Sequence, residues 1–343
     1  MRLAFNRLFL LFVFGLFQVS AHAVEVDADY YKNKTIFLDI GVPPGGGNDL
    51  YGRIFAKYLG SHIPGQPKVI ARNMEGAGGL RVANYIYTSA PKDGTEIALV
   101  LSSAIMQPLL GEQDNARFNP ELFTWIGSLN KEIAGCALWY SADVKNFEDT
   151  FKRKIRLGAS GPTGIMGQQS LILKNLLGVQ ADIIFGYTGA TDVMLAMQRG
   201  EVDGMCAVNA STLMSQWKED WTAKRMNVFV QLGLQNHRAF GAAPNIFNFA
   251  KTDQEKMVLR LLLGQSLIGR PIVAPPGTTA EASHILRKAM FETLADPEFI
   301  DESQRLNLEF DAVSAQDIEA FFAEYKSYPP EIIERAKNVL KVQ

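Results

Sequence analysis

Cysteine, histidine and clustered positive charge are all scarce in this chain, and each scarcity argues against a class of function. Only 2 of the 343 residues are cysteine and 4 are histidine. Three histidines, His62, His237 and His284, lie far apart without acidic neighbours at metal-ligand spacing, so no metal site is expected. Lysine and arginine total 34 against 36 acidic residues and form no basic block, which argues against a nucleic-acid partner.

Motifs that carry catalysis or nucleotide binding are also missing. The chain contains neither Gly-x-Ser-x-Gly nor His-Glu-x-x-His. Its run of three glycines at residues 45–47 lacks the Lys-Ser/Thr of a P-loop and the spacing of a dinucleotide fingerprint. We therefore expect a protein without cofactor and without catalytic activity.

Long apolar runs are confined to the N-terminus. Arg2 and Arg7 form a basic start, residues 8–17 are almost continuously apolar, and Ala21-His22-Ala23 resembles a cleavage site. The apolar run is shorter than the ~20 residues that span a bilayer, which favours a signal peptide over residues 1–23 rather than an uncleaved anchor. We expect export to the periplasm and a soluble mature protein, because no later stretch approaches ~18 continuous apolar residues.

Two cysteines, Cys136 and Cys206, remain in the exported chain. An oxidising compartment permits a disulfide between them, and two separate buried thiols are the alternative. We expect the disulfide.

Glycine is plentiful, and much of it follows short apolar strands. Four times a strand runs into a Gly-rich turn that opens into an amphipathic helix: IFLDIGVPPGGGND before Leu50, VIARNMEGAGG before Leu80, IRLGASGPTG before Ile165, and IIFGYTGATD before Val193. Such a turn exposes backbone N–H groups, and a helix N-terminus adds unsatisfied donors and partial positive charge. Each unit can therefore hold a small anion, although a tight turn with an ordinary helix cap is the alternative.

The order of elements predicts an α/β protein with two lobes. Hydrophobic periodicity alternates between strands and helices, which favours largely parallel sheets. The chain exceeds the ~100 to 200 residues of a typical domain, and its rhythm is interrupted between residues 118 and 131. We expect one lobe over residues 24–130 plus 231–343 and the other over 131–230. A ligand cleft between the lobes follows, because ligands favour domain interfaces and the carboxyl ends of parallel strands.

The expected ligand-binding residues come from these turns and from the end of one later strand. Asp49 is ambiguous, since it can cap its own helix or face the ligand. The expected set is Gly45, Gly46, Gly47, Asn48, Asp49, Gly76, Ala77, Gly78, Gly79, Ser160, Thr163, Gly164, Tyr187, Thr188, Gly189, Asp192 and Asn209.

Taken together, the motifs resemble those of the tripartite tricarboxylate transporter substrate-binding proteins, the TctC or Bug family. The resemblance spans nearly the whole mature chain in the family's order. It is carried by Gly45–Asp49, Asn73–Gly79, Pro91–Gly94, Gly186–Gly189, Gly200–Asp203 and Ala274–Thr278. Three positions depart from the family: Met74-Glu75 stands in place of the common Arg-Pro, and Val42 in place of a frequent aromatic residue. An acidic Glu75 near the cleft would disfavour a multiply charged anion unless it points outward or pairs with a ligand amine.

The resemblance implies a periplasmic-binding-protein fold of type II that closes on a small organic carboxylate and delivers it to a membrane permease. It also implies binding through backbone amides, hydroxyls and ordered waters rather than an arginine clamp. We expect the protein to be a monomer. Two other functions stay open: an extracytoplasmic sensor that presents the carboxylate to a membrane kinase, and an enzyme on the same fold.

Overall fold

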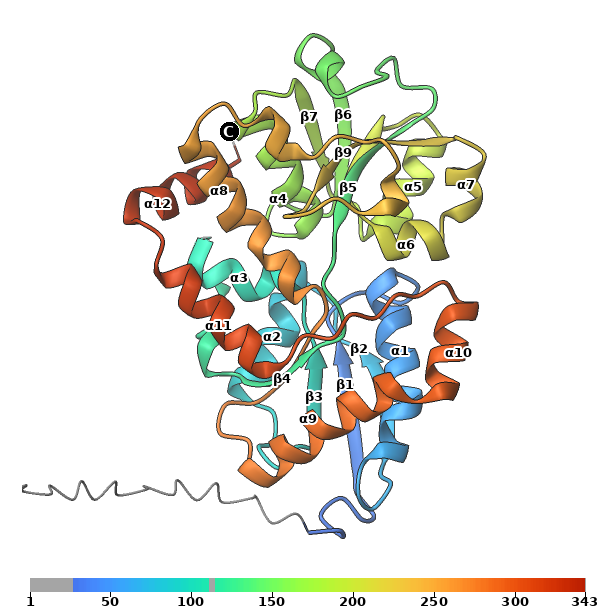
Figure 1. The fold of residues 1–343 in the computed structure, drawn as a ribbon, viewed down its shortest axis with the longest axis vertical. Coiled ribbons are helices and arrows are strands. Elements are labelled where there is room, and N and C mark those ends of the chain that lie inside the picture. Colours follow the sequence, from blue (N-terminus) through green and yellow to red (C-terminus); the bar gives the residue numbers. More distant parts are fainter. Residues whose placement is uncertain (1–26, 111–114, 343) are drawn as a thin grey trace, which may run out of the picture.

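The computed structural model describes residues 27–110 and 115–342, and these form two α/β lobes stacked along the long axis of the molecule (Figure 1). The expected signal peptide, residues 1–23, lies outside the described residues. Each lobe is built on one five-stranded sheet, so the α/β class and the two-lobe organisation predicted from the sequence are confirmed.

The first sheet has the strand order β2-β1-β3-β10-β4. Its strands are β1 (Thr35–Ile40), β2 (Lys68–Asn73), β3 (Glu96–Leu99), β4 (Thr124–Ser128) and β10 (Pro271–Ala274). Strand β1 pairs in parallel with β2 and β3, whereas β10 runs antiparallel to both of its neighbours. Because β10 comes from late in the chain, the first lobe is completed only after the second has been built.

The second sheet repeats this plan, with the order β7-β6-β8-β5-β9. Its strands are β5 (Ala134–Trp139), β6 (Ile155–Ala159), β7 (Ala181–Phe185), β8 (Gly204–Asn209) and β9 (Met226–Leu232). Here β6 pairs in parallel with β7 and β8, and β5 is antiparallel to β8 and β9. The chain thus crosses between lobes after β4 and again between β9 and β10.

The lobe boundaries given above stay predictions. The first boundary falls between β4 and β5. The second falls inside β9, so the second sheet continues past residue 230 as far as Leu232.

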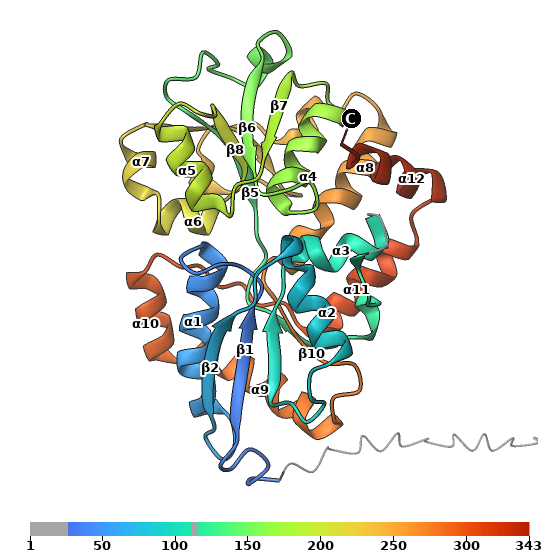
Figure 2. The same cartoon turned by 180° about the vertical axis from the view of Figure 1, so that it is seen from behind.

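Helices cover the faces of both sheets (Figures 1 and 2). They are α1 (Gly47–Leu59), α2 (Leu80–Thr88), α3 (Ser102–Leu110), α4 (Ile165–Leu171), α5 (Ala190–Gln198), α6 (Ala210–Ser215), α7 (Lys218–Thr222), α8 (Asp253–Leu263), α9 (Ala280–Ala295), α10 (Pro297–Arg305), α11 (Ala315–Lys326) and α12 (Pro330–Val339). Among the residues that the structure describes, none of these helices has the length and apolar character needed to cross a bilayer.

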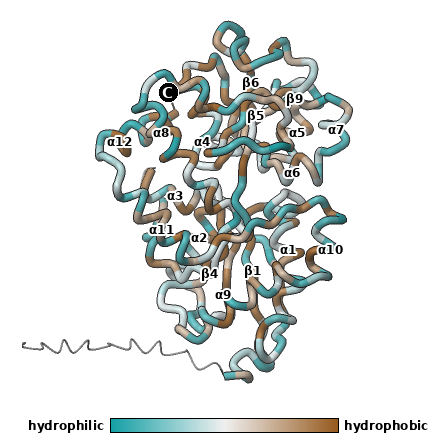
Figure 3. Tube along the Cα trace, viewed as in Figure 1, coloured by the Kyte–Doolittle hydropathy of each residue, from teal (hydrophilic) through white to brown (hydrophobic). Residues whose placement is uncertain are grey.

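The largest hydrophobic core joins the two lobes. It contains side chains of α2 and α3 from the first lobe, β5 and β6 from the second, and α8, α11 and α12 between them. In Figure 3 the apolar colouring follows the strands, while the outer turns of the helices are polar. Apolar strands buried on both faces favour this arrangement, because helices from other parts of the chain must cover them.

A disulfide links Cys136 in β5 to Cys206 in β8, with a sequence separation of 70 residues. Both side chains are fully buried in the core of the second lobe. The bond therefore fastens two neighbouring antiparallel strands.

Candidate functional site

The Gly-rich turns of the two lobes meet between the sheets. A Cβ atom placed on Gly78 would lie 3.0 Å from Thr163 Oγ1 and 3.4 Å from the backbone nitrogen of Gly164. A Cβ on Gly189 would lie 3.7 Å from Pro43, in the approach to the first turn. All four turns that the sequence singled out thus lie at the interface between the lobes.

The first turn is held by a carboxylate. Asp49 is buried, and its side chain accepts hydrogen bonds from the Gly45 backbone nitrogen at 2.9 Å, Arg53 Nε at 3.0 Å and Asn73 Nδ2 at 2.8 Å. The helix begins at Gly47 rather than near Leu50, and Gly46 is its N-cap without a side-chain hydrogen bond. Asp49 therefore braces the turn that precedes the helix instead of capping the helix.

These contacts keep the Asp49 carboxyl group ionised. Burial by itself would raise its pKa, but the hydrogen bonds from Arg53, Gly45 and Asn73 outweigh burial and lower the pKa below its usual value. Because the Asp49 carboxylate is paired with Arg53, the backbone N–H groups at the N-terminus of α1 remain available to a ligand.

The second turn needs glycine for its backbone geometry. Its four residues, Gly76, Ala77, Gly78 and Gly79, have φ angles of 132°, 49°, 63° and 92°. Residues other than glycine rarely adopt positive φ angles, and Ala77 is the one non-glycine residue of this turn. The chain can therefore turn sharply from β2 into α2 and bring its backbone close to the facing lobe.

The turns of the second lobe contribute backbone and hydroxyl groups. Gly164 and Gly189 are the N-caps of α4 and α5, and neither helix is capped by a side chain. The Thr188 hydroxyl donates to the Asp192 carboxylate, so this acid already has one partner within its own turn. Asn209 ends β8 as the N-cap of α6, again without a side-chain cap. The remaining predicted residues, Asn48, Ser160 and Tyr187, belong to the same turns.

An arginine that the sequence analysis missed lies at the base of this interface. Arg270 is fully buried, forms an ion pair with Glu132 through Nη1, and donates from Nη2 to Ser211 Oγ at 3.1 Å. A Cβ on Gly47 would lie 2.5 Å from Thr212 Oγ1 and 3.7 Å from Arg270 Nη2. The guanidinium group therefore stands between the start of α1 and the start of α6.

The charge of Arg270 is compensated from several sides. Glu132 also accepts from Ser211 at 3.0 Å and from Asn130 Nδ2 at 2.9 Å, and the guanidinium carbon lies 3.7 Å from the centre of the Tyr51 ring. Burial lowers the pKa of Arg270 to about 10, which still leaves the side chain charged at neutral pH.

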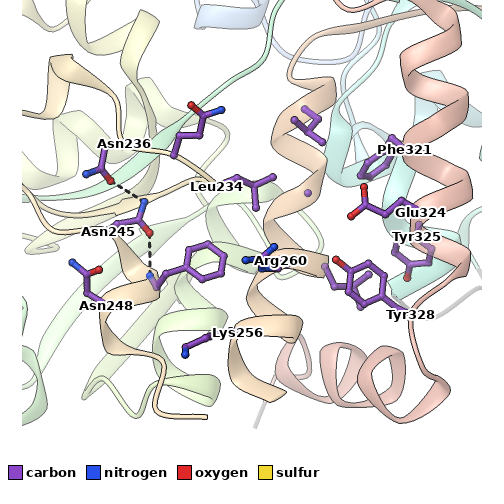
Figure 4. Close-up of a pocket in the computed structure, with 15 residues that line it drawn as sticks. Leu234, Asn236, Asn245, Asn248, Lys256, Arg260, Phe321, Glu324, Tyr325 and Tyr328 are labelled. Carbon is purple, nitrogen blue, oxygen red and sulfur yellow. Dashed lines mark hydrogen bonds between the residues drawn. The ribbon is translucent and has the colours of Figure 1, made fainter. Parts of the chain in front are cut away.

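Two of the cavities in the described part of the chain lie outside the turns and border α8 or the segment after β9. One, of about 550 Å³, is bordered by α8, α11 and the segment after β9 (Figure 4). A neighbouring one, of about 270 Å³, borders Glu132, Ser211 and His237. Neither is lined by a residue of the four Gly-rich turns, which instead approach one another across the interface.

The described residues contain no group of three or more histidine, cysteine, aspartate or glutamate side chains arranged to hold a metal ion. The chemical resources of the interface are backbone N–H groups at helix starts, hydroxyl groups and carboxylates that are already hydrogen-bonded. Such a set suits the binding of an anion.

Comparison with protein families gives a match over most of the chain. The model described as tripartite tricarboxylate transporter family receptor matches residues 53–337. Protein BugT of Bordetella pertussis (strain Tohama I) is 38% identical over 96 residues, a match that covers 28% of this chain and only 28% of BugT.

Solved structures show the same fold at low sequence identity. The R. palustris protein Rpa4515 with adipate has a TM-score of 0.70 and 16% identity, with 89% of this chain and 98% of that chain covered. The periplasmic binding protein BugD has a TM-score of 0.68 and 20% identity, with 90% and 98% covered. MatC from Rhodopseudomonas palustris with bound malate has a TM-score of 0.67 and 16% identity, with 90% and 99% covered. By its family match and its fold, the chain belongs to the tripartite tricarboxylate transporter receptor family and has a type II periplasmic-binding-protein fold.

Proposed function

We propose that this protein captures a small organic carboxylate between its two lobes in the periplasm and delivers it to the membrane permease of a tripartite tricarboxylate transporter. The observation that carries the proposal is the convergence of four Gly-rich turns, two from each lobe, on one interface. Each turn leads into a helix start, where backbone N–H groups and the helix dipole favour an anion.

The relatives support the ligand class. MatC is seen with malate and Rpa4515 with adipate, and both have the fold of this chain. The family's description as a transporter receptor supports the permease as partner and capture without catalysis as the role. We further propose that the protein acts as a monomer.

Recognition would depend mainly on neutral donors. The buried cation at the base of the interface is paired with Glu132, and Asp49 is paired with Arg53. A ligand carboxylate would therefore be held by backbone N–H groups and hydroxyls, and each such charge-assisted hydrogen bond contributes about 1.5 to 3 kcal/mol. Losing one of them should weaken affinity by about one to two powers of ten.

Native mass spectrometry of freshly purified protein tests the proposal first, because a bound carboxylate should appear as a discrete added mass. Calorimetry with that acid, and with malate and adipate, then measures affinity. Gly78→Val should abolish binding, because the side chain would meet Thr163 and Gly164 of the opposite lobe.

Gly277→Val is the matched control. Gly277 has a φ of 77°, close to the 63° of Gly78, but it lies beside Lys92, away from the turns. Both variants incur similar backbone strain, so only the effect on lobe closure differs. Unchanged affinity in Gly78→Val would mean that the ligand binds elsewhere.

A further inference from the structure

The 550 Å³ cavity has the size of a small-molecule site and lies outside the proposed carboxylate cleft. Its walls come from the segment after β9, from α8, and from α11 with the residue Tyr328 that follows it (Figure 4). The segment after β9 and α8 (Asp253–Leu263) follow each other in the sequence, α11 (Ala315–Lys326) comes much later, and none of the three contributes to the Gly-rich turns.

One part of the cavity wall is apolar. It is lined by Phe247, Leu267 and Phe321, together with the ring of Tyr325. Phe321 and Tyr325 are buried, so their positions are set by the core beneath them. An apolar body of a ligand would find a rigid surface here.

Two opposite charges on this cavity have no partner among the residues that the structure describes. The Arg260 guanidinium and the Glu324 carboxylate take part in no ion pair or side-chain hydrogen bond, whereas Lys256 is paired with Asp253 at 3.2 Å. Figure 4 shows Arg260 between the asparagine side chains and the side of the cavity that carries Glu324 and Tyr328.

Tyr328 lines the cavity together with both charged side chains and lies within electrostatic range of each. Burial raises the pKa of the Tyr328 hydroxyl, the negative charge of Glu324 raises it further, and the positive charge of Arg260 lowers it. Both charged groups thus act on one phenol without pairing with each other.

The amide groups add polar contacts to the cavity wall. Asn245 is already occupied, because its Nδ2 donates to Asn236 Oδ1 at 2.9 Å and its Oδ1 accepts from the Phe247 backbone nitrogen at 3.0 Å. The side chain of Asn248 makes no hydrogen bond within the described part of the chain, so its amide is available to a ligand.

We propose that this cavity is a second binding site, for a small zwitterion with an apolar body, whose carboxylate faces Arg260 and whose ammonium group faces Glu324. An amino acid with an apolar side chain is the simplest ligand of this class. A purely anionic ligand would bring a second negative charge toward Glu324, and a purely cationic one would face Arg260. Charge complementarity therefore selects the molecule that carries both charges.

L-Phenylalanine, 3-phenylpropanoate and 2-phenylethylamine test the site by calorimetry on the mature protein. The three probes share an aromatic body and differ only in their charged groups. We expect L-phenylalanine to bind at least about fivefold more tightly than either analogue, a modest ratio because both charged side chains are exposed. Arg260→Gln and Glu324→Gln should each reduce L-phenylalanine affinity by a similar factor.

Arg305→Gln, on the exposed face of α10, is the control and should leave the affinity unchanged. Gly78→Val separates the two sites, because it should block the interlobe cleft and leave binding of L-phenylalanine intact. The proposal is overturned if L-phenylalanine does not bind, if both charge variants bind it as the wild type does, or if Gly78→Val abolishes its binding.

Discussion

At the scale of single residues, side-chain hydrogen bonds hold the backbone of the turns in place. Asp49 illustrates this, because three N–H donors converge on its carboxylate and the turn beside it approaches the opposite lobe. The acid that the sequence marked as a candidate ligand contact is thus engaged in holding the turn. Its contribution to binding would be indirect, through the geometry of the turn.

Asp49→Asn should therefore lower the stability of the protein. Asparagine retains one acceptor oxygen but presents an NH₂ group to the remaining donors, which should cost about 1 to 3 kcal/mol of unfolding free energy. Urea denaturation of the variant measures the loss. Arg53→Gln is the comparison and should cost less, because that side chain is half exposed. Unchanged stability with reduced ligand affinity would instead mean that the charge faces the ligand.

Asp203 is expected to make a pH-dependent contribution to the stability of the folded protein. Burial would raise its pKa, but the Arg156 side chain and backbone nitrogen, which both donate to its carboxylate, lower the pKa below its usual value. A folded pKa below the unfolded one gives stability that is present above the unfolded value of ~3.9 and is lost as pH falls through the folded value.

We expect Asp203→Asn to reduce the urea midpoint at pH 7 and to reduce it much less at pH 3. Asp301→Asn serves as the exposed control, because Asp301 lies on the surface of α10. An equal difference at both pH values would contradict the assignment of this charge to stability.

At the scale of elements, glycine and the disulfide perform different tasks. The positive φ angles of residues 76–79 allow β2 to turn directly into α2, and the disulfide ties β5 to β8 in the other lobe. The turn sets how closely the lobes can approach. The disulfide restricts the unfolded chain rather than the folded one.

Replacing both cysteines by alanine should destabilise the protein by about 4 kcal/mol, the chain-entropy value for a loop of this length. Thiol counting under denaturing conditions checks the bond directly in the wild type, and denaturation of the double variant measures its effect. Two reactive thiols in the wild type would show that the bond is absent from the exported protein.

At the scale of the whole molecule, the shared hydrophobic core connects the lobes. Ile332 and Val339 of α12 belong to the same core as Leu80 of the first lobe and Leu157 of the second. Partial unfolding of one lobe would expose apolar surface of the other.

We expect calorimetry to show one cooperative unfolding transition. Ile332→Ala, at a buried position, should shift the whole transition to lower temperature, since such a truncation costs about 2 to 5 kcal/mol. Lys337→Ala, on the same helix, is the control for a general effect of changes in α12. It should shift the unfolding temperature only slightly. Two separated transitions would show that the lobes unfold independently.

The sequence by itself determined the class of fold and the positions of the turns. Those features depend on local signals: an apolar run predicts a strand, and glycine before an amphipathic segment predicts a turn and a helix start. The helix boundary was less accurate, since α1 starts at Gly47 rather than near Leu50. Glycine can serve as an N-cap without any side chain, so no capping residue marks that start in the sequence.

Only the tertiary structure decided which distant residues share a site. Arg270 and Glu132 are 138 positions apart, and they meet because the chain crosses between the lobes twice and brings both crossings together. Arg260 and Glu324 reach one cavity for a similar reason, since α8 and α11 pack around the joined core. Neither pair has a local sequence signal, because the order of strands and the path of the crossings, rather than periodicity or spacing, place such residues together.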